Sequence, residues 1–144
     1  MRLAEYTDYT LRVLMYLALN RDRLVTIVEI AAAYDISAHH LMKVAQHLVR
    51  SGLIESTRGK GGGVRLAQEP NAIRIGSVVR NSEGYGPIVE CLSEQPDCCR
   101  IAPACRLTDI LVRAFEALYA TLDKYTLADL VQQPQALQTT LLHR

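Results

Sequence analysis

The feature that most restricts the fold of this chain is a pair of short helical segments separated by only three residues. Thr26 and Glu29 have the spacing of a capping box, which predicts a helix over residues 27–34. Ser37 then precedes a second helical segment, residues 38–50, whose apolar positions recur at intervals of three and four. These inward positions are Leu41, Val44, Ala45 and Leu48. Two short helices joined by so tight a turn predict a helix-turn-helix.

A glycine-rich turn follows and predicts a β-hairpin. Four glycines occupy the five positions 59–63, between strand-like segments over residues 53–57 and 64–66. A hairpin tip with so little side-chain bulk can bring its backbone amides, Arg58 and Lys60 against phosphate groups. A nucleotide-binding P-loop is set aside, because the Walker spacing is not met and no β-α unit surrounds the glycines.

The predicted fold class is mainly α with a small β-wing: a winged helix-turn-helix followed by a long C-terminal dimerisation helix. Thr7 can cap a first helix, and Ile73 and Ile75 can add a short strand before a short helix. We predict a winged-helix DNA-binding domain over residues 1–80, a cysteine-bearing loop over 81–106, a dimerisation helix over 107–125, and a short helix with a frayed tail over 126–144.

Charge is distributed unevenly along the chain. The net charge of +1 by itself predicts no polyanionic partner. Residues 37–66, however, hold five basic side chains against one acidic side chain. We therefore predict that this face binds double-stranded DNA, with the second helix of the motif reading bases and the wing contacting the phosphate backbone. The predicted contact residues are Ser37, Ala38, His39, His40, Lys43, Arg58 and Lys60.

The long helix carries more apolar surface than one small domain needs. Its apolar positions recur at spacings of four and three over two heptads, a pattern typical of helices that pair with one another. These positions are Leu111, Phe115, Leu118 and Leu122. We predict a homodimer built on this helix, which would place its two reading helices on a near-palindromic operator.

The predicted loop and its end hold all four cysteines, Cys91, Cys98, Cys99 and Cys105. Cytosolic cysteines are seldom disulfide-bonded, and their spacings here do not match the paired cysteines of structural zinc sites. Three thiolates spread over such a loop can reach corners of an iron-sulphur cluster, which is wider than one metal ion. Buried free cysteines that only fill space are the open alternative.

Several segments together resemble a known family. They are Met1-Arg-Leu3, Thr7-Asp8-Tyr9, Leu11-Arg12, the helix-turn-helix, the wing from Arg58 to Gly63, and the closing segment from Cys99 to Leu107. The chain resembles the iron-sulphur winged-helix transcriptional regulators over about residues 1–130. Within that family, Asp8 and Thr108 favour the nitric-oxide-responsive repressors over the regulators of iron-sulphur assembly, which typically have a basic residue and a histidine there.

The resemblance implies a cluster site. Cys91, Cys99 and Cys105 would ligate an iron-sulphur cluster, [4Fe-4S] in the first instance with [2Fe-2S] as the alternative, and Asp8 of the partner subunit would supply the fourth ligand. Cys98 is an alternative middle ligand, because it is adjacent to Cys99. Arg12 would hold the carboxylate in place.

Taken together with these patterns, the resemblance implies a dimeric DNA-binding repressor whose cluster senses nitric oxide and controls operator affinity, so that genes for nitric oxide detoxification are derepressed. The alternatives are a regulator of the same fold that senses iron or redox stress, and a redox or electron-transfer protein. No constellation of acid-base groups indicates an enzyme. We expect a cytoplasmic protein without a membrane partner, because the apolar stretch from Leu11 to Leu19 contains Arg12.

Overall fold

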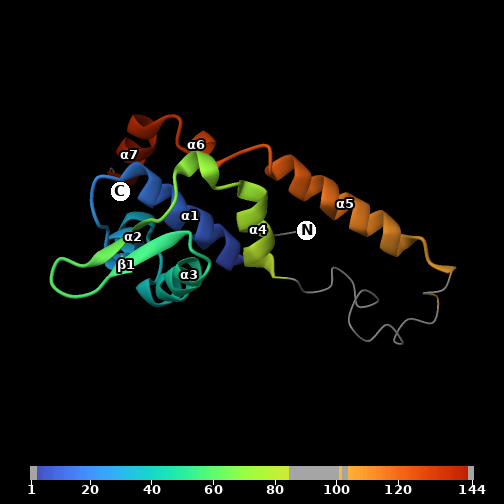
Figure 1. The fold of residues 1–144 in the computed structure, drawn as a ribbon, viewed down its shortest axis with the longest axis horizontal. Coiled ribbons are helices and arrows are strands. Elements are labelled where there is room, and N and C mark those ends of the chain that lie inside the picture. Colours follow the sequence, from blue (N-terminus) through green and yellow to red (C-terminus); the bar gives the residue numbers. More distant parts are fainter. Residues whose placement is uncertain (1–2, 85–100, 102–103, 143–144) are drawn as a thin grey trace.

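The computed structural model describes residues 3–84, 101 and 104–142 (Figure 1). Its elements, in chain order, are α1 (Glu5–Leu19), α2 (Ile27–Tyr34), α3 (Ala38–Arg50), β1 (Ile54–Thr57), β2 (Gly63–Leu66), η1 (Pro70–Ala72), α4 (Ile75–Glu83), α5 (Leu107–Leu122), α6 (Leu127–Leu130) and α7 (Pro134–Leu142). Among the described residues the two strands form one small antiparallel sheet. The predicted fold class, mainly α with a small β-wing, is confirmed.

The helix-turn-helix consists of α2 and α3, which have the predicted bounds. The Thr26 hydroxyl accepts a hydrogen bond from the Glu29 backbone N–H at 3.2 Å. The second half of the predicted capping box is not formed, because the Glu29 carboxylate instead accepts hydrogen bonds from Tyr16 and Arg23. Asp35 ends α2 in the left-handed conformation, with φ 55°. Asp tolerates this conformation better than most side chains, so the turn can be very short.

The wing is the predicted glycine-rich hairpin. Its register pairs Ile54 with Leu66, Glu55 with Arg65, Ser56 with Val64 and Thr57 with Gly63. Gly59 and Gly61 have φ of 96° and 78°, a region that side chains disfavour, which explains the glycines at the tip. Val25 and Val64 also exchange backbone hydrogen bonds of 3.0 and 2.8 Å, so the wing is fixed to the segment before α2.

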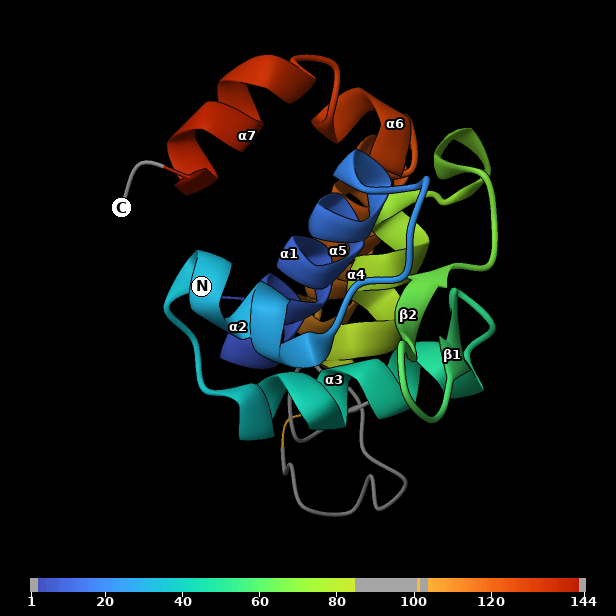
Figure 2. The same ribbon diagram turned by 90° about the vertical axis from the view of Figure 1, so that its left-hand side faces the viewer.

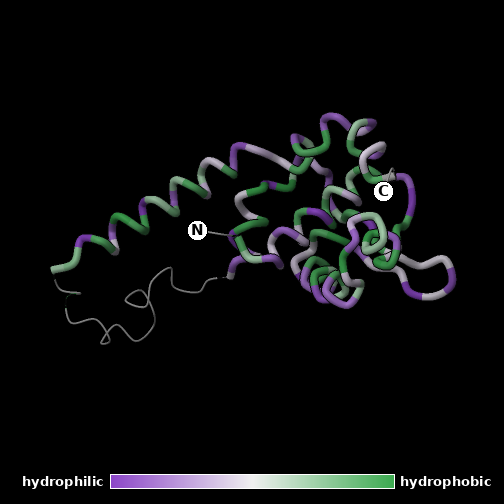
Figure 3. The backbone as a smooth tube through the Cα atoms, turned by 180° about the vertical axis from the view of Figure 1, so that it is seen from behind, coloured by the Kyte–Doolittle hydropathy of each residue, from purple (hydrophilic) through white to green (hydrophobic). Residues whose placement is uncertain are grey.

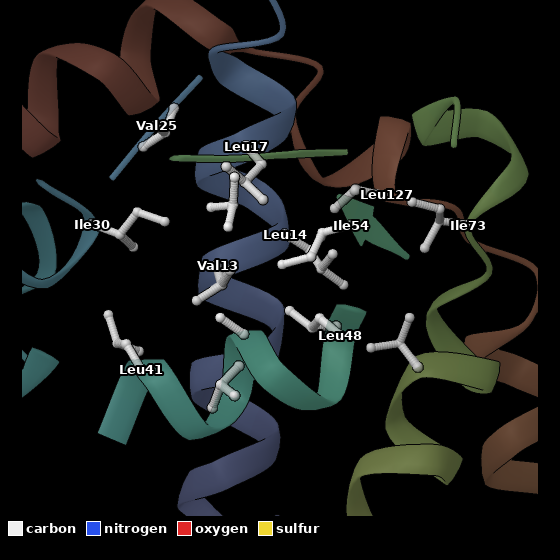
Figure 4. Packing of buried hydrophobic residues seen from close by; sticks show 14 of the residues in the cluster. Val13, Leu14, Leu17, Val25, Ile30, Leu41, Leu48, Ile54, Ile73 and Leu127 are labelled. Atoms are coloured by element: carbon white, nitrogen blue, oxygen red, sulfur yellow. The ribbon is translucent and has the colours of Figure 1, made fainter. Parts of the chain in front are cut away.

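The hydrophobic core lies where α1 and α3 face each other beneath the wing (Figure 4). Its side chains are aliphatic and come from most elements of the winged domain. Those at most 2% exposed include Val13, Leu14, Leu17, Ile30, Leu41, Leu48, Ile54 and Leu127. Burial of each such side chain contributes about 1.5–3 kcal/mol, so this core fixes the orientation of α3 relative to the wing.

The beginning of α1 differs from the prediction. The helix begins at Glu5 with Ala4 at the N-cap, so Thr7 is not a cap. Thr7 is instead fully buried, and its hydroxyl donates a hydrogen bond of 2.5 Å to the Glu83 carboxylate. Threonine is a common cap residue near the start of a helix. The role of Thr7 is instead set by Glu83, which lies 76 residues away in the sequence.

Two later segments also differ from the prediction. The strand predicted around Ile73 is absent: α4 begins at Ile75, and only an isolated bridge joins Arg74 to Thr126. The tail predicted to fray contains α7, which lies beside α2 (Figure 2). The Gln138 side chain donates a hydrogen bond of 3.3 Å to the Leu19 carbonyl oxygen.

Helix α5 extends away from the winged domain, and its turns alternate between hydrophilic and hydrophobic residues (Figures 1 and 3). Its C-terminal half contacts α4. The Arg80 guanidinium lies 4.3 Å from the centre of the Tyr119 ring and 3.9 Å from the Asp123 carboxylate. After α5 the chain returns to the core through α6, where the Leu127 N–H donates a hydrogen bond of 2.9 Å to the Ile73 carbonyl oxygen.

Candidate DNA-binding face and candidate cluster ligands

The outward side of α3 is a continuous polar stripe. The helix buries Leu41, Val44, Ala45 and Leu48 on its other side. The stripe consists of His39, Lys43, Gln46 and Arg50, all of them exposed. These residues recur at spacings of four, three and four, which aligns them on one helix face. Helix α3 contains no acidic side chain, so the stripe favours a negatively charged partner.

The beginning of α3 is open to solvent. Ser37 is exposed at the N-cap position and its side chain makes no capping hydrogen bond, contrary to the simplest expectation for a serine there. Ala38 is half-buried. The N-terminal backbone N–H groups of a helix and its dipole favour an anion, so this end of α3 suits a DNA phosphate.

Two histidines of α3 lie on the flank that packs beside α1. The His40 ring stacks on Tyr9, with 6.4 Å between ring centroids. His47, two turns later, meets the Tyr6 ring edge to face at 5.9 Å. His40 and His39 are both predicted DNA contacts, but only His39 lies on the central stripe.

The wing presents two cations at its tip. Arg58 and Lys60 are exposed and form no ion pair within the described part of the chain. Arg65, on β2, is instead paired with Glu55 at 3.0 Å. A groove of about 510 Å³ separates α3 from the wing. Its lining includes Met42, Gln46, Val49, Arg50, Ser56 and Arg58.

Asp8 and Arg12 form the predicted pair on α1. Their side chains approach to 2.8 Å and are 50% and 41% exposed, respectively. The Arg12 guanidinium also lies 5.7 Å from the centre of the Tyr34 ring. Arg12 is therefore held by a second contact on α2, while the Asp8 carboxylate keeps half of its surface available to another group.

Glu83 connects the end of α4 to the beginning of α1. One oxygen of its carboxylate accepts hydrogen bonds from the Ala4 backbone N–H at 2.9 Å and from the Thr7 hydroxyl at 2.5 Å. A carboxylate at a helix N-terminus also interacts favourably with the helix dipole. The turn that carries Asp8 is thereby attached to the residue at which α4 ends.

Three of the four cysteines, Cys91, Cys98 and Cys99, lie outside the described residues. Cys105 is described: it has a free thiol, is half-buried and comes shortly before α5 begins at Leu107. No group of three or more candidate metal-binding side chains is found among the residues that the structure describes. That end of α5 lies far from α1 in the same chain (Figure 1), so Cys105 and Asp8 of one chain are not brought together.

The apolar stripe of α5 has no buried member in this chain. Leu111, Phe115, Leu118 and Leu122 are each half-buried, and the helix as a whole buries no residue. Leu107 and Ile110 are 57% and 58% exposed. A helix this apolar and this exposed favours a partner surface.

Sequence reasoning missed Glu83 as a structural link and Arg80, Tyr119 and Asp123 as the contact between α4 and α5. These groups are separated by long stretches of sequence, and no local pattern connects them. Gln46 is not among the DNA-contacting residues predicted from the sequence. Its spacing from Lys43 and Arg50 would have placed it on the same stripe.

A helix-turn-helix with a basic outward face, followed by a glycine-rich wing with free cations at its tip, defines a winged-helix DNA-binding protein. The Rrf2 family, described as "Iron-dependent Transcriptional regulator", matches residues 3–133. The chain belongs to this family, and is a transcriptional regulator.

Curated relatives cover nearly the whole chain. The protein named HTH-type transcriptional regulator NsrR from Bacillus subtilis (strain 168) is 46% identical over 142 residues, 98% of this chain and 97% of that protein. The protein of the same name from Geobacillus kaustophilus is 45% identical over 145 residues, 100% of this chain and 99% of that protein. These relatives are named as regulators rather than as enzymes, in agreement with the prediction.

Solved structures share the fold. CymR, the global cysteine regulator of B. subtilis, is similar with a TM-score of 0.72 and 28% identity over 92% of this chain and 97% of that chain. IscR of T. potens has a TM-score of 0.70 at 23% identity over 92% of this chain and 87% of that chain, which bears on the fold alone. None of the helices in the described ranges is long and apolar enough to span a membrane.

Proposed function

We propose that this protein is a homodimeric repressor that binds a near-palindromic operator, and that an iron-sulphur cluster sensing nitric oxide sets its operator affinity. The observation that carries the proposal is the separation, within one chain, of two predicted ligands. Asp8 lies on α1 beside the core, whereas Cys105 precedes the far end of an exposed helix. The simplest way for Asp8 and Cys105 to bind the same cluster is for each to come from a different subunit.

The apolar stripe of α5 supports a two-fold arrangement of this kind. If two α5 helices pair antiparallel through Leu111, Phe115, Leu118 and Leu122, the free end of each helix approaches the winged domain of the other copy. Each cysteine-bearing segment would then meet Asp8 of the partner subunit. The site is therefore incomplete in a single chain.

The donor set fits a cluster better than a single metal ion. Cys91, Cys99 and Cys105 would hold it together with Asp8 of the partner subunit, and Cys98 is the alternative middle ligand. When bound, the cluster supplies iron to which nitric oxide binds. A carboxylate is a harder donor than a thiolate, so this ligand would be the most exchangeable of the four. Arg12, at 2.8 Å from Asp8 in the same chain, would orient that carboxylate.

The described contacts supply a route from the ligand to the DNA-binding face. The beginning of α1 carries Asp8, and its neighbour Tyr9 stacks on His40 of the reading helix. Glu83 holds the same turn of α1 against α4. Loss of the bond to Asp8 would therefore shift the equilibrium between two conformations of the protomer that differ in DNA affinity. Nitric oxide would not need to compete with DNA for the DNA-binding face.

Gel shifts with three forms of the protein test the proposal. Cluster-loaded protein purified without oxygen should bind operator DNA about a hundredfold more tightly than cluster-free or nitric-oxide-treated protein, a coupling of about 2.7 kcal/mol. Equal affinity in all three forms would exclude the cluster as the switch. If operator affinity drops with an iron chelator or with oxygen, but not with nitric oxide, the protein is instead a sensor of iron or of redox state. The family description names iron dependence.

Ligand variants make the test specific. Cys91→Ala, Cys99→Ala and Cys105→Ala should each abolish the cluster absorbance and specific binding, and Cys98→Ala should preserve both. Asp8→Ala should retain a cluster with altered stability. If Cys98→Ala loses the cluster and Cys99→Ala retains it, the middle ligand is Cys98.

A further inference from the structure

The groove between α3 and the wing combines an apolar wall with a single amide. Met42 and Val49, which line it, are large apolar side chains that are 49% and 38% exposed. Between them along α3 lies Gln46, exposed both to the groove and to the polar stripe. Apolar surface left open beside a charged face indicates contact with a partner.

The charges around the groove identify the partner as a nucleic acid duplex. Arg50 and Arg58 are among its lining residues, Lys43 continues the stripe on α3, and α3 carries no acidic residue. A major groove has phosphates at its margins and base edges at its floor. A surface that combines cations with apolar side chains and one amide offers groups for both the phosphates and the base edges.

We propose that Gln46 and Met42 determine the base specificity of this protein: the Gln46 amide pairs with N6 and N7 of an adenine, and Met42 contacts the methyl group of a neighbouring thymine. Among the exposed stripe residues, only glutamine offers a donor and an acceptor side by side, which is the pattern of adenine in the major groove. Thymine is the base that presents a methyl group there. The inference rests on the proposed DNA binding and assigns its sequence preference to two residues absent from the set predicted from the sequence.

Selection from a randomised duplex library tests Gln46. Cluster-loaded wild-type protein should enrich adenine at one position of each half-site, and Gln46→Ala should lose that preference while the other positions keep theirs. Gln46→Glu should change the preferred base there from adenine to cytosine, because a carboxylate only accepts and cytosine N4 donates. Gln133→Ala, an exposed glutamine outside α3 and the wing, is the matched control and should leave the selected sequence unchanged.

Base analogues in the wild-type selected duplex test both contacts. Replacing the adenine by 7-deazaadenine should weaken wild-type binding about tenfold and leave Gln46→Ala unaffected. Replacing the neighbouring thymine by uracil should weaken wild-type binding by several-fold and leave Met42→Ala unaffected, because both changes remove the same contact. Circular dichroism confirms that each variant is folded.

The outcomes separate this inference from the proposed function. If wild-type protein selects a sequence and binds it with a steep salt dependence, but Gln46→Glu selects the same base, the assignment to Gln46 is wrong and the DNA-binding function stands. If uracil weakens Met42→Ala as much as wild type, the assignment to Met42 is wrong. If the wild-type protein enriches no sequence at all, the proposed operator binding and this inference both fail.

Discussion

The winged domain and α5 use leucine in opposite ways. Leu48 of α3 is completely buried, in a core to which α1, α2, α4, α6 and both strands contribute. Leu118 of α5 belongs to an equally regular apolar pattern, yet its helix contains no buried residue. The winged domain therefore buries most of its apolar surface within one chain, whereas α5 leaves its apolar stripe half-buried or exposed. An amphipathic pattern predicts that one face of a helix will be buried. Whether that face packs within the same chain or against a second subunit depends on where the helix lies relative to the core.

The largest expected effect comes from a charge on the exposed stripe. Leu118→Glu would place an unpaired buried charge in each copy of a dimer, at a cost of about 3 kcal/mol or more per copy. Sedimentation should show monomer or aggregate in place of dimer, and specific DNA binding should be lost. Ala120→Glu, at an exposed position outside the stripe, should remain dimeric. If Leu118→Glu sediments as a folded dimer, the stripe does not form the subunit interface.

The next largest effect is expected from a cavity in the core of the winged domain. Leu48→Ala leaves a void in the aliphatic core and should lower the free energy of unfolding by about 2–5 kcal/mol, as measured by urea denaturation. Its neighbour Val49, 38% exposed, is the control, and Val49→Ala should change that free energy by about 0.5 kcal/mol. Comparable losses for the two variants would mean that α3 is not packed as described.

The contact between the two regions should have an intermediate effect. A Cβ atom at Gly76 would lie 2.6 Å from the Tyr119 carbonyl oxygen and closer still to the Asp123 carboxylate. Gly76→Ala should therefore displace α5 from α4 and cost about 1–3 kcal/mol in thermal unfolding. Adding Asp123→Ala should recover part of that loss, because it also removes a buried oxygen that has no hydrogen-bond partner among the described residues. If the changes in unfolding free energy of Gly76→Ala and Asp123→Ala simply add, the two residues are not in contact.

The smallest effect concerns the pH dependence of the winged domain. The hydrogen bond from Arg23 holds the pKa of Glu29 below its ordinary value of 4.5. A lowered folded-state pKa stabilises the protein above the unfolded value, and this stabilisation is lost as the pH falls through the folded one. The stability advantage of wild type over Arg23→Met should therefore be present at neutral pH and shrink below about pH 4.5. Arg58→Met, which removes a cation without a described ion pair, should show no such change in urea denaturation.

Most of the winged domain could be predicted because the sequence patterns that specify it are local. The turn after Tyr34, the spacing in α3 and the glycines of the wing each act within a few residues, so α2, α3 and the hairpin lie where the sequence places them. The surroundings of the predicted base contacts could not be predicted in the same way. The sequence predicts His40 and His39 as DNA contacts but gives no sign that the exposed His40 ring also stacks on Tyr9 of α1. That contact depends on how two helices cross, which no local pattern contains.

The sequence by itself determined the helix-turn-helix, the wing, the basic bias of that face and the apolar stripe of α5, because periodicity, capping and glycine placement depend on neighbouring residues. Only the tertiary structure decided that Thr7 is buried against Glu83, that Gln46 and Met42 share a groove with the wing, and that Arg80 of α4 contacts Tyr119 at the C-terminal end of α5. Each of these joins groups distant in the chain. Such contacts arise from the packing of whole elements, so they appear only when the elements are assembled.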